Sequence, residues 1–124
     1  MKPRVSISRV RDQNTYAALT EAVGRIGALT DLIPRGSTVV VKPNYVMGPT
    51  ERGVTNPAVV EAVVRLVAST SPARLVIGEG SADCYTPSVF RIHNVYELAS
   101  RYGAECVDLN QEATFIKMSC RTGD

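Results

Sequence analysis

Hydrophobic and polar positions change their spacing along the chain, and each spacing predicts a strand or a helix. In residues 4–10, RVSISRV, Val5 and Ile7 alternate with polar neighbours, which predicts a first strand ending near Val10, where the period of two breaks. After Asn14 the apolar residues recur at steps of three and four, which is typical of one face of a helix. These apolar positions are Tyr16, Leu19, Val23 and Ile26. Asp12 or Asn14 can cap the start of this helix.

The next strand and helix are marked by a β-branched run and a capping pair. Residues 38–42, TVVVK, show no alternation, which predicts a strand buried on both faces. Asn56 followed by Pro57 predicts a helix start, because the asparagine side chain can accept an amide hydrogen bond and proline lacks only a donor that is unused there. We expect the core face of this helix to be Val59, Val63, Leu66 and Val67. Glu61 and Arg65 have the spacing of an ion pair.

The second half of the chain continues the alternation of strands and helices. Residues 73–80, ARLVIGEG, predict a buried strand ended by glycines, and residues 86–103 predict a helical stretch with a break near Asn94 and a stop at Gly103. Residues 104–110, AECVDLN, predict a fourth strand, and residues 114–119, TFIKMS, have the composition of another.

This order predicts an α/β fold. Alternating β-α units indicate an open, mainly parallel sheet with helices on both faces, formed by a single domain over residues 1–124. Because no helix is predicted after residues 114–119, we expect the sheet to finish on an uncovered edge and the domain to be incomplete.

Composition and charge narrow the classes of function. Hydrophobic residues make up 44% and charged residues 21% of the chain, as in ordinary globular proteins. The net charge of +2 is spread without a dense basic stripe, so we expect no nucleic-acid partner. No apolar run approaches the ~18 residues of a membrane span, and residues 1–12 lack the apolar core of a signal peptide. We therefore expect a cytoplasmic protein without a membrane partner.

The cysteines give no sign of a metal centre. Cys84, Cys106 and Cys120 are odd in number, far apart, and form no C-x-x-C pair. This spacing favours reduced thiols over a disulfide framework, and it contains no cysteine cluster for a zinc or iron–sulfur site. The cofactor is left unknown.

Polar residues follow the predicted strands at their carboxyl ends. Open α/β sheets bind ligands in the crevice beyond these ends, so the polar residues are candidates for a ligand site. They are Lys42 and Asn44, Thr55 and Asn56 before the next helix, Glu79 and Ser81, and Asp108 and Asn110.

Each candidate also has a structural explanation. Lys42 closes a buried valine run, so its ammonium either reaches solvent or binds a phosphate or carboxylate, which the amides at the next helix start would also contact. Asn56 is explained equally well as a helix cap. Glu79, in the loop GEGSAD, is a candidate metal ligand or general base, or a solvated loop carboxylate. The loop lacks the third glycine of a dinucleotide fingerprint. His93, the only histidine, is expected to be packed or on the surface rather than catalytic.

Four blocks of the sequence resemble a known family. They are VVVKPNYV, GVTNPAVVEAVVRLV, LVIGEGS and YELASRYGAECVDLN, and they resemble successive blocks of the family called domain of unknown function 362, over about residues 37–110. Some members of that family carry a ferredoxin-like module with clustered cysteines, which this sequence lacks. Members are usually more than twice as long and have a later lysine-threonine-histidine block. The resemblance therefore implies that the chain corresponds to the N-terminal portion of the family domain.

Two hypotheses of function follow. In the first, the strand ends bind a small phosphorylated or carboxylated molecule, which Lys42 contacts, Asn44 and Thr55 orient with help from Asn56 and Ser81, and Glu79 serves as metal ligand or base. In the second, the chain is a non-catalytic, truncated or accessory module. It would act by forming a homo-oligomer or by docking to a partner that supplies the missing half, because unpaired strands and uncovered apolar faces favour association.

Overall fold

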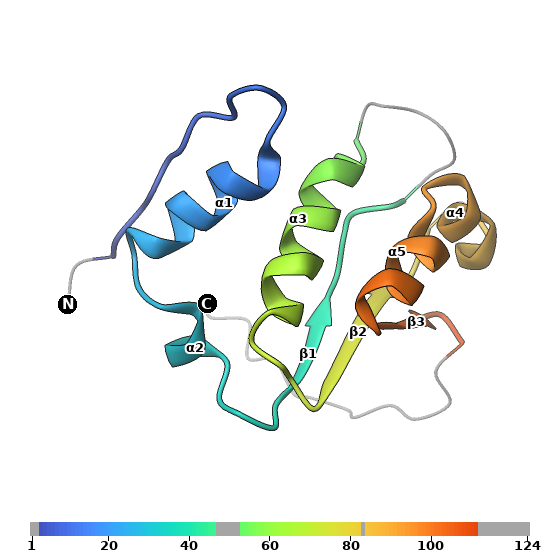
Figure 1. The fold of residues 1–124 in the computed structure, drawn as a ribbon. Coiled ribbons are helices and arrows are strands. Elements are labelled where there is room, and N and C mark those ends of the chain that lie inside the picture. Colours follow the sequence, from blue (N-terminus) through green and yellow to red (C-terminus); the bar gives the residue numbers. More distant parts are fainter. Residues whose placement is uncertain (1–2, 47–52, 83, 112–124) are drawn as a thin grey trace, which may run out of the picture.

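The computed structural model describes residues 3–46, 53–82 and 84–111, which form a parallel sheet with helices packed on it (Figure 1). The sheet has three strands in the order β1 (Thr38–Val41), β2 (Arg74–Glu79) and β3 (Glu105–Asp108). All are parallel, with Val39 beside Leu75. The carboxyl ends of the strands thus lie along one edge, as the α/β prediction requires. The predicted strand at residues 114–119 lies outside the described residues.

The helices form one layer against the sheet. Between β1 and β2 runs α3 (Pro57–Ala68), and between β2 and β3 run α4 (Thr86–Ile92) and α5 (Val95–Tyr102). Both α3 and α5 lie on the same face in Figure 1. We expected helices on both faces. Each strand, however, adds to the same side of the one before, so right-handed crossovers place both helices on one face.

Two further helices lie before the sheet. The first, α1 (Thr15–Gly24), packs beside α3 and not directly on a strand, and the short α2 (Leu29–Leu32) leads toward β1 (Figure 1). Within the part of the chain that the structure describes, no helix is both long and apolar enough to cross a membrane.

The predicted caps and stops are present. Asn14 Oδ1 accepts a hydrogen bond from the Ala17 amide at 3.0 Å, which starts α1. Asn94, at φ 54°, separates α4 from α5, and Gly103, at φ 66°, ends α5. Glycine suits the left-handed conformation because it has no Cβ. These local signals are therefore confirmed.

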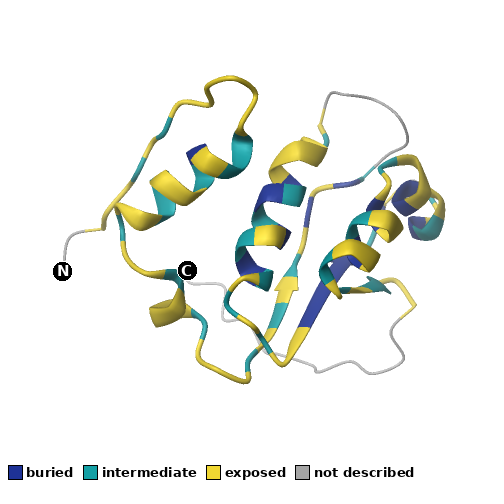
Figure 2. Ribbon diagram, in the orientation of Figure 1, coloured by how far each residue is buried: buried dark blue, intermediate teal, exposed yellow. Residues whose placement is uncertain are grey.

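The core lies between the sheet and α3, α4 and α5, as the dark blue residues of Figure 2 show. Val64 and Ile77 at its centre have no exposed surface. The predicted core face of α3 was right at Val67 and wrong at Val59. Its buried residues are Val60, Ala62, Val64 and Val67, whereas Val59 is 39% exposed. Valines occur in this helix as two adjacent pairs, at positions 59–60 and 63–64, so the pattern alone did not fix which member of each pair turns inward.

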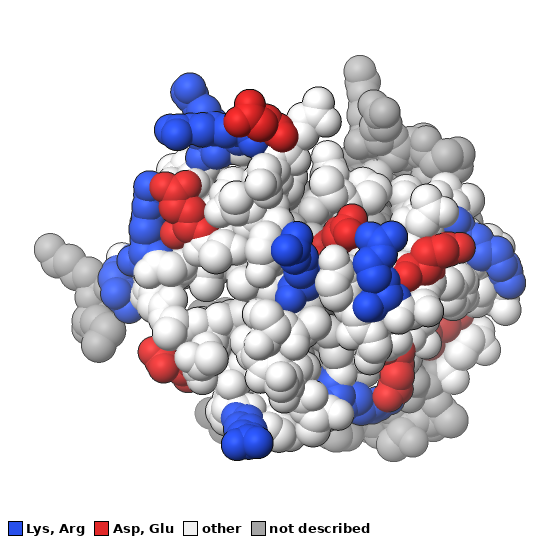
Figure 3. All heavy atoms as spheres, viewed as in Figure 1, with Lys and Arg blue, Asp and Glu red and all other residues white. Residues whose placement is uncertain are grey.

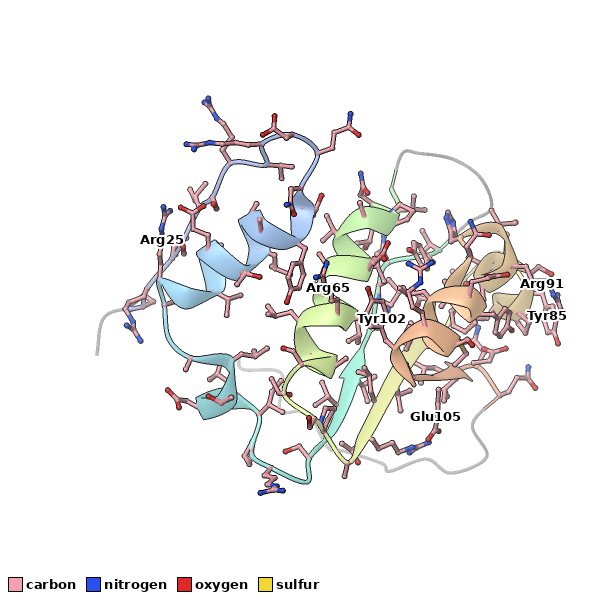
Figure 4. All side chains as sticks on the ribbon, viewed as in Figure 1. Arg25, Arg65, Tyr85, Arg91, Tyr102 and Glu105 are labelled. Atoms are coloured by element: carbon pink, nitrogen blue, oxygen red, sulfur yellow. The ribbon has the colours of Figure 1, made fainter. Side chains whose placement is uncertain are left out.

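The predicted ion pair of α3 is replaced by longer-range contacts. Glu61 accepts a hydrogen bond from Arg101 Nη1 of α5 at 2.6 Å, and Arg65 lies over the ring of Tyr16 from α1, 3.8 Å from its centroid. On the face shown in Figure 3, acidic and basic side chains alternate over α3 and α5, and Figure 4 labels Arg65 on α3. These contacts tie the helices of the layer to one another.

Two strand predictions were wrong at the N-terminal side of the sheet. Residues 4–10 form no strand; Val5 and Ile7 are 86% and 82% exposed. The expectation that β1 is buried on both faces also fails, because exposed and half-buried residues alternate along it and Val40 is 56% exposed. Among the described residues β1 pairs with β2 alone, so it is an edge strand with one covered face.

The capping role of Asn56 predicts a specific loss of stability. Asn56 Oδ1 accepts a hydrogen bond from the Ala58 amide at 2.9 Å, with Pro57 at the first helical position. Replacing Asn56 with alanine should lower the free energy of unfolding by about 1 kcal/mol, because this amide loses its acceptor. Urea unfolding followed by circular dichroism measures the change. Asn56→Asp should retain most of the stability, and equal losses in both variants would contradict a capping role.

Candidate functional site at the strand ends

The carboxylate of Glu79 is the centre of the strand-end cluster. It is the last residue of β2 and is only 1% exposed. Its Oε2 accepts a hydrogen bond from the Tyr45 amide at 2.7 Å, and its Oε1 accepts one from the Gly80 amide at 2.8 Å. Because a buried carboxylate must be paired and hydrogen-bonded, these contacts fix the turn after β1 against the end of β2.

Lys42 supplies the opposite charge. Its Nζ lies 2.8 Å from Glu79 Oε1 and also donates to the carbonyl oxygen of Pro43 at 3.1 Å. The lysine side chain is 54% exposed. An ammonium has three N–H groups, so one of them is left for solvent or a ligand. Lys42 therefore contacts a buried carboxylate and is also exposed to solvent at the carboxyl ends of the strands.

The environment of Glu79 holds its carboxyl group ionised. Burial raises the pKa, but the hydrogen bond from Lys42, those from the Tyr45 and Gly80 amides, and the lysine charge lower it, and the net pKa lies below the ordinary value of 4.5. With a lowered pKa and both oxygens engaged, Glu79 has the features of a structural anion more than those of a base.

Asn44 and Thr55 close the base of the segment that connects β1 to α3. The Asn44 amide donates to Thr55 Oγ1 at 2.8 Å, and the Thr55 amide donates to the Asn44 carbonyl oxygen at 3.0 Å. Asn44 Nδ2 also donates to the carbonyl oxygen of Gly53 at 2.6 Å. These three bonds bring the two ends of the segment together directly after Lys42.

Ser81 connects the turn to the loop after β2. Its buried hydroxyl donates to the Tyr45 carbonyl oxygen at 2.7 Å, and its own carbonyl oxygen accepts from Asn110 Nδ2 at 2.9 Å. Asn110 also approaches Gly80 closely, since a Cβ at that glycine would lie 2.8 Å from Asn110 Oδ1. The Asn110 side chain therefore joins the residues after β3 to the loop after β2.

Tyr45 is the residue of this cluster that the sequence interpretation missed. Its ring is 1% exposed and stacks on His93, with centroids 4.3 Å apart and planes at 8°. Burial raises the pKa of Tyr45 to about 12, so the phenol stays neutral at physiological pH. The sequence feature that could have identified Tyr45 is the presence of one aromatic residue in the otherwise polar turn KPNY. Of the two positions expected for His93, packed or on the surface, the structure shows the packed one, half-buried against the Tyr45 ring.

The structure brings some of the predicted site residues together and separates others. Lys42 contacts Glu79, Asn44 contacts Thr55, and Ser81 is linked to the same turn through Tyr45. Asn56 faces the start of α3 as its cap, and its side chain already occupies the Ala58 amide that we expected to contact an anion. The described residues contain no cluster of three His, Cys, Asp or Glu side chains able to hold a metal.

A family model matches the part of the chain that carries this cluster. The model of the domain of unknown function DUF362 matches residues 39–123, more than half of the chain. The chain belongs to this family. The DUF362 match contains all six predicted site residues and excludes α1, and it occupies the C-terminal rather than the N-terminal portion of the chain. That it corresponds to the N-terminal portion of the DUF362 domain stays a prediction.

Other comparisons add no relative. No curated protein matches the chain, and neither does any solved structure. The functional argument for this DUF362 chain therefore depends on its own geometry.

Replacing Glu79 with glutamine tests the clip between the turn and β2. Glutamine has one acceptor oxygen, so its NH₂ group would face either the Tyr45 or the Gly80 amide, donor against donor. We expect a loss of about 2 to 4 kcal/mol in the free energy of unfolding, measured with urea. Glu61→Gln is the control, because this carboxylate is 44% exposed and its ion pair should contribute less than about 1 kcal/mol. Equal effects in the two variants would show that Glu79 is not a buried clip.

The lowered pKa of Glu79 also predicts a dependence of stability on pH. Because the folded-state pKa lies below the ordinary value of 4.5, this contribution is fully present above that value and is lost as the pH falls through the folded-state pKa. Urea unfolding between about pH 7 and pH 2.5 should show a decline in stability that is smaller in Glu79→Gln than in the unchanged chain. Parallel pH curves would contradict the assignment.

Proposed function

We propose that the turn after β1 binds a small anion, a phosphate or a carboxylate group, through the ammonium of Lys42. The observation that carries the proposal is the Lys42 side chain, which is 54% exposed and whose ammonium has two acceptors among the described residues, so that a third N–H can donate to a ligand. Its position beyond the carboxyl end of β1 is where open α/β sheets bind ligands.

The neighbouring residues of this proposed site hold Lys42 in place, and Glu79 neutralises part of its charge. The Glu79 charge is shared among Lys42 and the amides of Tyr45 and Gly80, so the lysine is only partly neutralised. The Asn44 amide is bound to Thr55 two residues after Lys42, and the Ser81 hydroxyl is bound to the Tyr45 carbonyl oxygen of the same turn. A site assembled on rigid elements loses little entropy when a ligand binds.

Titration with inorganic phosphate tests the anion site. Backbone amide shifts of residues 42–46 in heteronuclear NMR spectra should move with phosphate and saturate. In Lys42→Ala the dissociation constant should rise at least about tenfold, because a charge-assisted hydrogen bond contributes about 1.5 to 3 kcal/mol. Lys42→Arg should retain binding.

Arg91→Ala is the matched control, since Arg91 is an exposed cation on α4 (Figure 4). If Lys42→Ala and Arg91→Ala weaken phosphate binding equally, or if phosphate moves no shift near Lys42, the proposed site is wrong.

A second candidate function is a docking module, which associates with itself or with a partner that supplies further structure. It is favoured by the exposed apolar residues Val5 and Ile7 beside α1 and Val40 in β1. Light scattering after size exclusion measures the mass directly. A monomer at every concentration would remove self-association from this candidate.

A further inference from the structure

Residues 4–10 present an apolar side to solvent. The segment runs along the side of α1 that faces away from α3 (Figure 1). Its serines turn toward α1: Ser8 donates a hydrogen bond to Glu21, and Ser6 Oγ is shielded with no partner among the described residues. Val5 and Ile7 point outward and are 86% and 82% exposed. The polar side chains of the segment thus face the protein and the apolar ones face solvent, whereas a strand that packs on its own core has the opposite arrangement.

The segment is held in place by its own helix. Arg25 Nη1, at the end of α1, donates to the Ile7 carbonyl oxygen at 2.7 Å, and its guanidinium also pairs with Glu21 (Figure 4). The alternating pattern of residues 4–10 is therefore presented on a fixed support, with Val5 and Ile7 available for contact.

The complementary feature is the free edge of β1. Among the described residues β1 pairs only with β2, which leaves the other backbone edge of Thr38–Val41 open, and Val40 is 56% exposed. Open edges of this kind accept an added strand through main-chain hydrogen bonds, while alternate side chains pack on the sheet face.

From these two features we infer that residues 4–10 of a second copy of the chain add as a strand to the free edge of β1. This inference rests on the docking candidate and names its surface. Among the described residues β1 and β3 are both edge strands, but β1 carries the exposed apolar side chain of Val40, whereas Cys106 and Val107 of β3 are half-buried. Each copy contributes the β1 edge and one outward apolar segment, so a symmetric pair would use both features twice. Val5 and Ile7 of one copy would then bury Val40 of the other.

A second copy fits this edge better than the segment of the same chain. Within one chain, residues 4–10 lie on the far side of α1, and reaching β1 would break the bonds from Arg25 and Ser8. If residues 4–10 paired with β1 of the same chain, Val5 and Ile7 would also have to turn from solvent toward the protein. A second copy can bring its segment to the edge with these bonds intact.

Light scattering over a range of concentrations tests the dimer and its surface. The unchanged chain should show twice the chain mass, and both Ile7→Lys and Val40→Lys should raise the dimer dissociation constant at least about tenfold, because a charge disfavours burial in the added strand. Both sites are exposed in the single chain, so these variants should fold. Ile92→Lys, at a 46% exposed position on α4, should leave the dimer unchanged.

Cysteine cross-linking distinguishes a second copy from the same chain. Ile7→Cys and Val40→Cys chains are mixed and oxidised, and the linked peptides are identified by mass spectrometry. A link between residues 7 and 40 in the mixture supports the inference. A link found only when both changes are in one chain, or no link at all, overturns it.

The outcomes also separate this surface from the functions proposed above. A dimer that persists in Ile7→Lys and Val40→Lys overturns this surface but keeps self-association. A monomeric unchanged chain removes both. Phosphate binding at Lys42 is measured independently of either result.

Discussion

The burial of one carboxylate sets the geometry at the carboxyl ends of the strands. A charge removed from water at the end of β2 is costly unless every lone pair finds a partner. Glu79 meets this requirement with the amides of Tyr45 and Gly80 and with the ammonium of Lys42. Two of these partners lie 34 and 37 positions earlier in the chain, so satisfying the carboxylate fixes the turn after β1 against β2.

Several neighbouring contacts depend on this clip. Once the Tyr45 amide is bound to Glu79, its ring is placed on His93 and its carbonyl oxygen accepts from Ser81. The same turn continues to Asn44, whose bonds to Thr55 close the connecting segment. A polar cluster that resembles a catalytic site in the sequence is thus largely a framework, and the exposed part of Lys42 is what it presents to solvent.

The two proposed activities use different ends of the molecule. The proposed anion site lies beyond the carboxyl ends of the strands, where hydrogen bonds join the polar groups to one another and Lys42 retains an N–H for a ligand. The proposed dimer surface uses the backbone edge of β1 and residues 4–10, where apolar side chains lack cover. Both proposed sites involve β1, which ends at Val41 directly before Lys42. A strand added to the edge of β1 would therefore stabilise the strand that leads to the lysine.

The sequence by itself determined the features that depend on near neighbours. The caps at Asn14 and Asn56, the break at Asn94 and the stop at Gly103 were predicted, because capping and left-handed turns involve residues within one helical turn. The alternation of β1, β2 and β3 with helices along the chain followed from the hydrophobic runs, and the family resemblance followed from the same stretches of sequence.

Only the tertiary structure decided features that need partners distant in the chain. Residues 4–10 have a strand pattern but no paired neighbour, and Glu61 turned to Arg101, 40 positions away, instead of Arg65. The environment of Glu79 likewise depends on which backbone amides the fold brings to it. Burial and pairing are properties of the assembled layers, and a local pattern of residues contains no information about which surface will cover it.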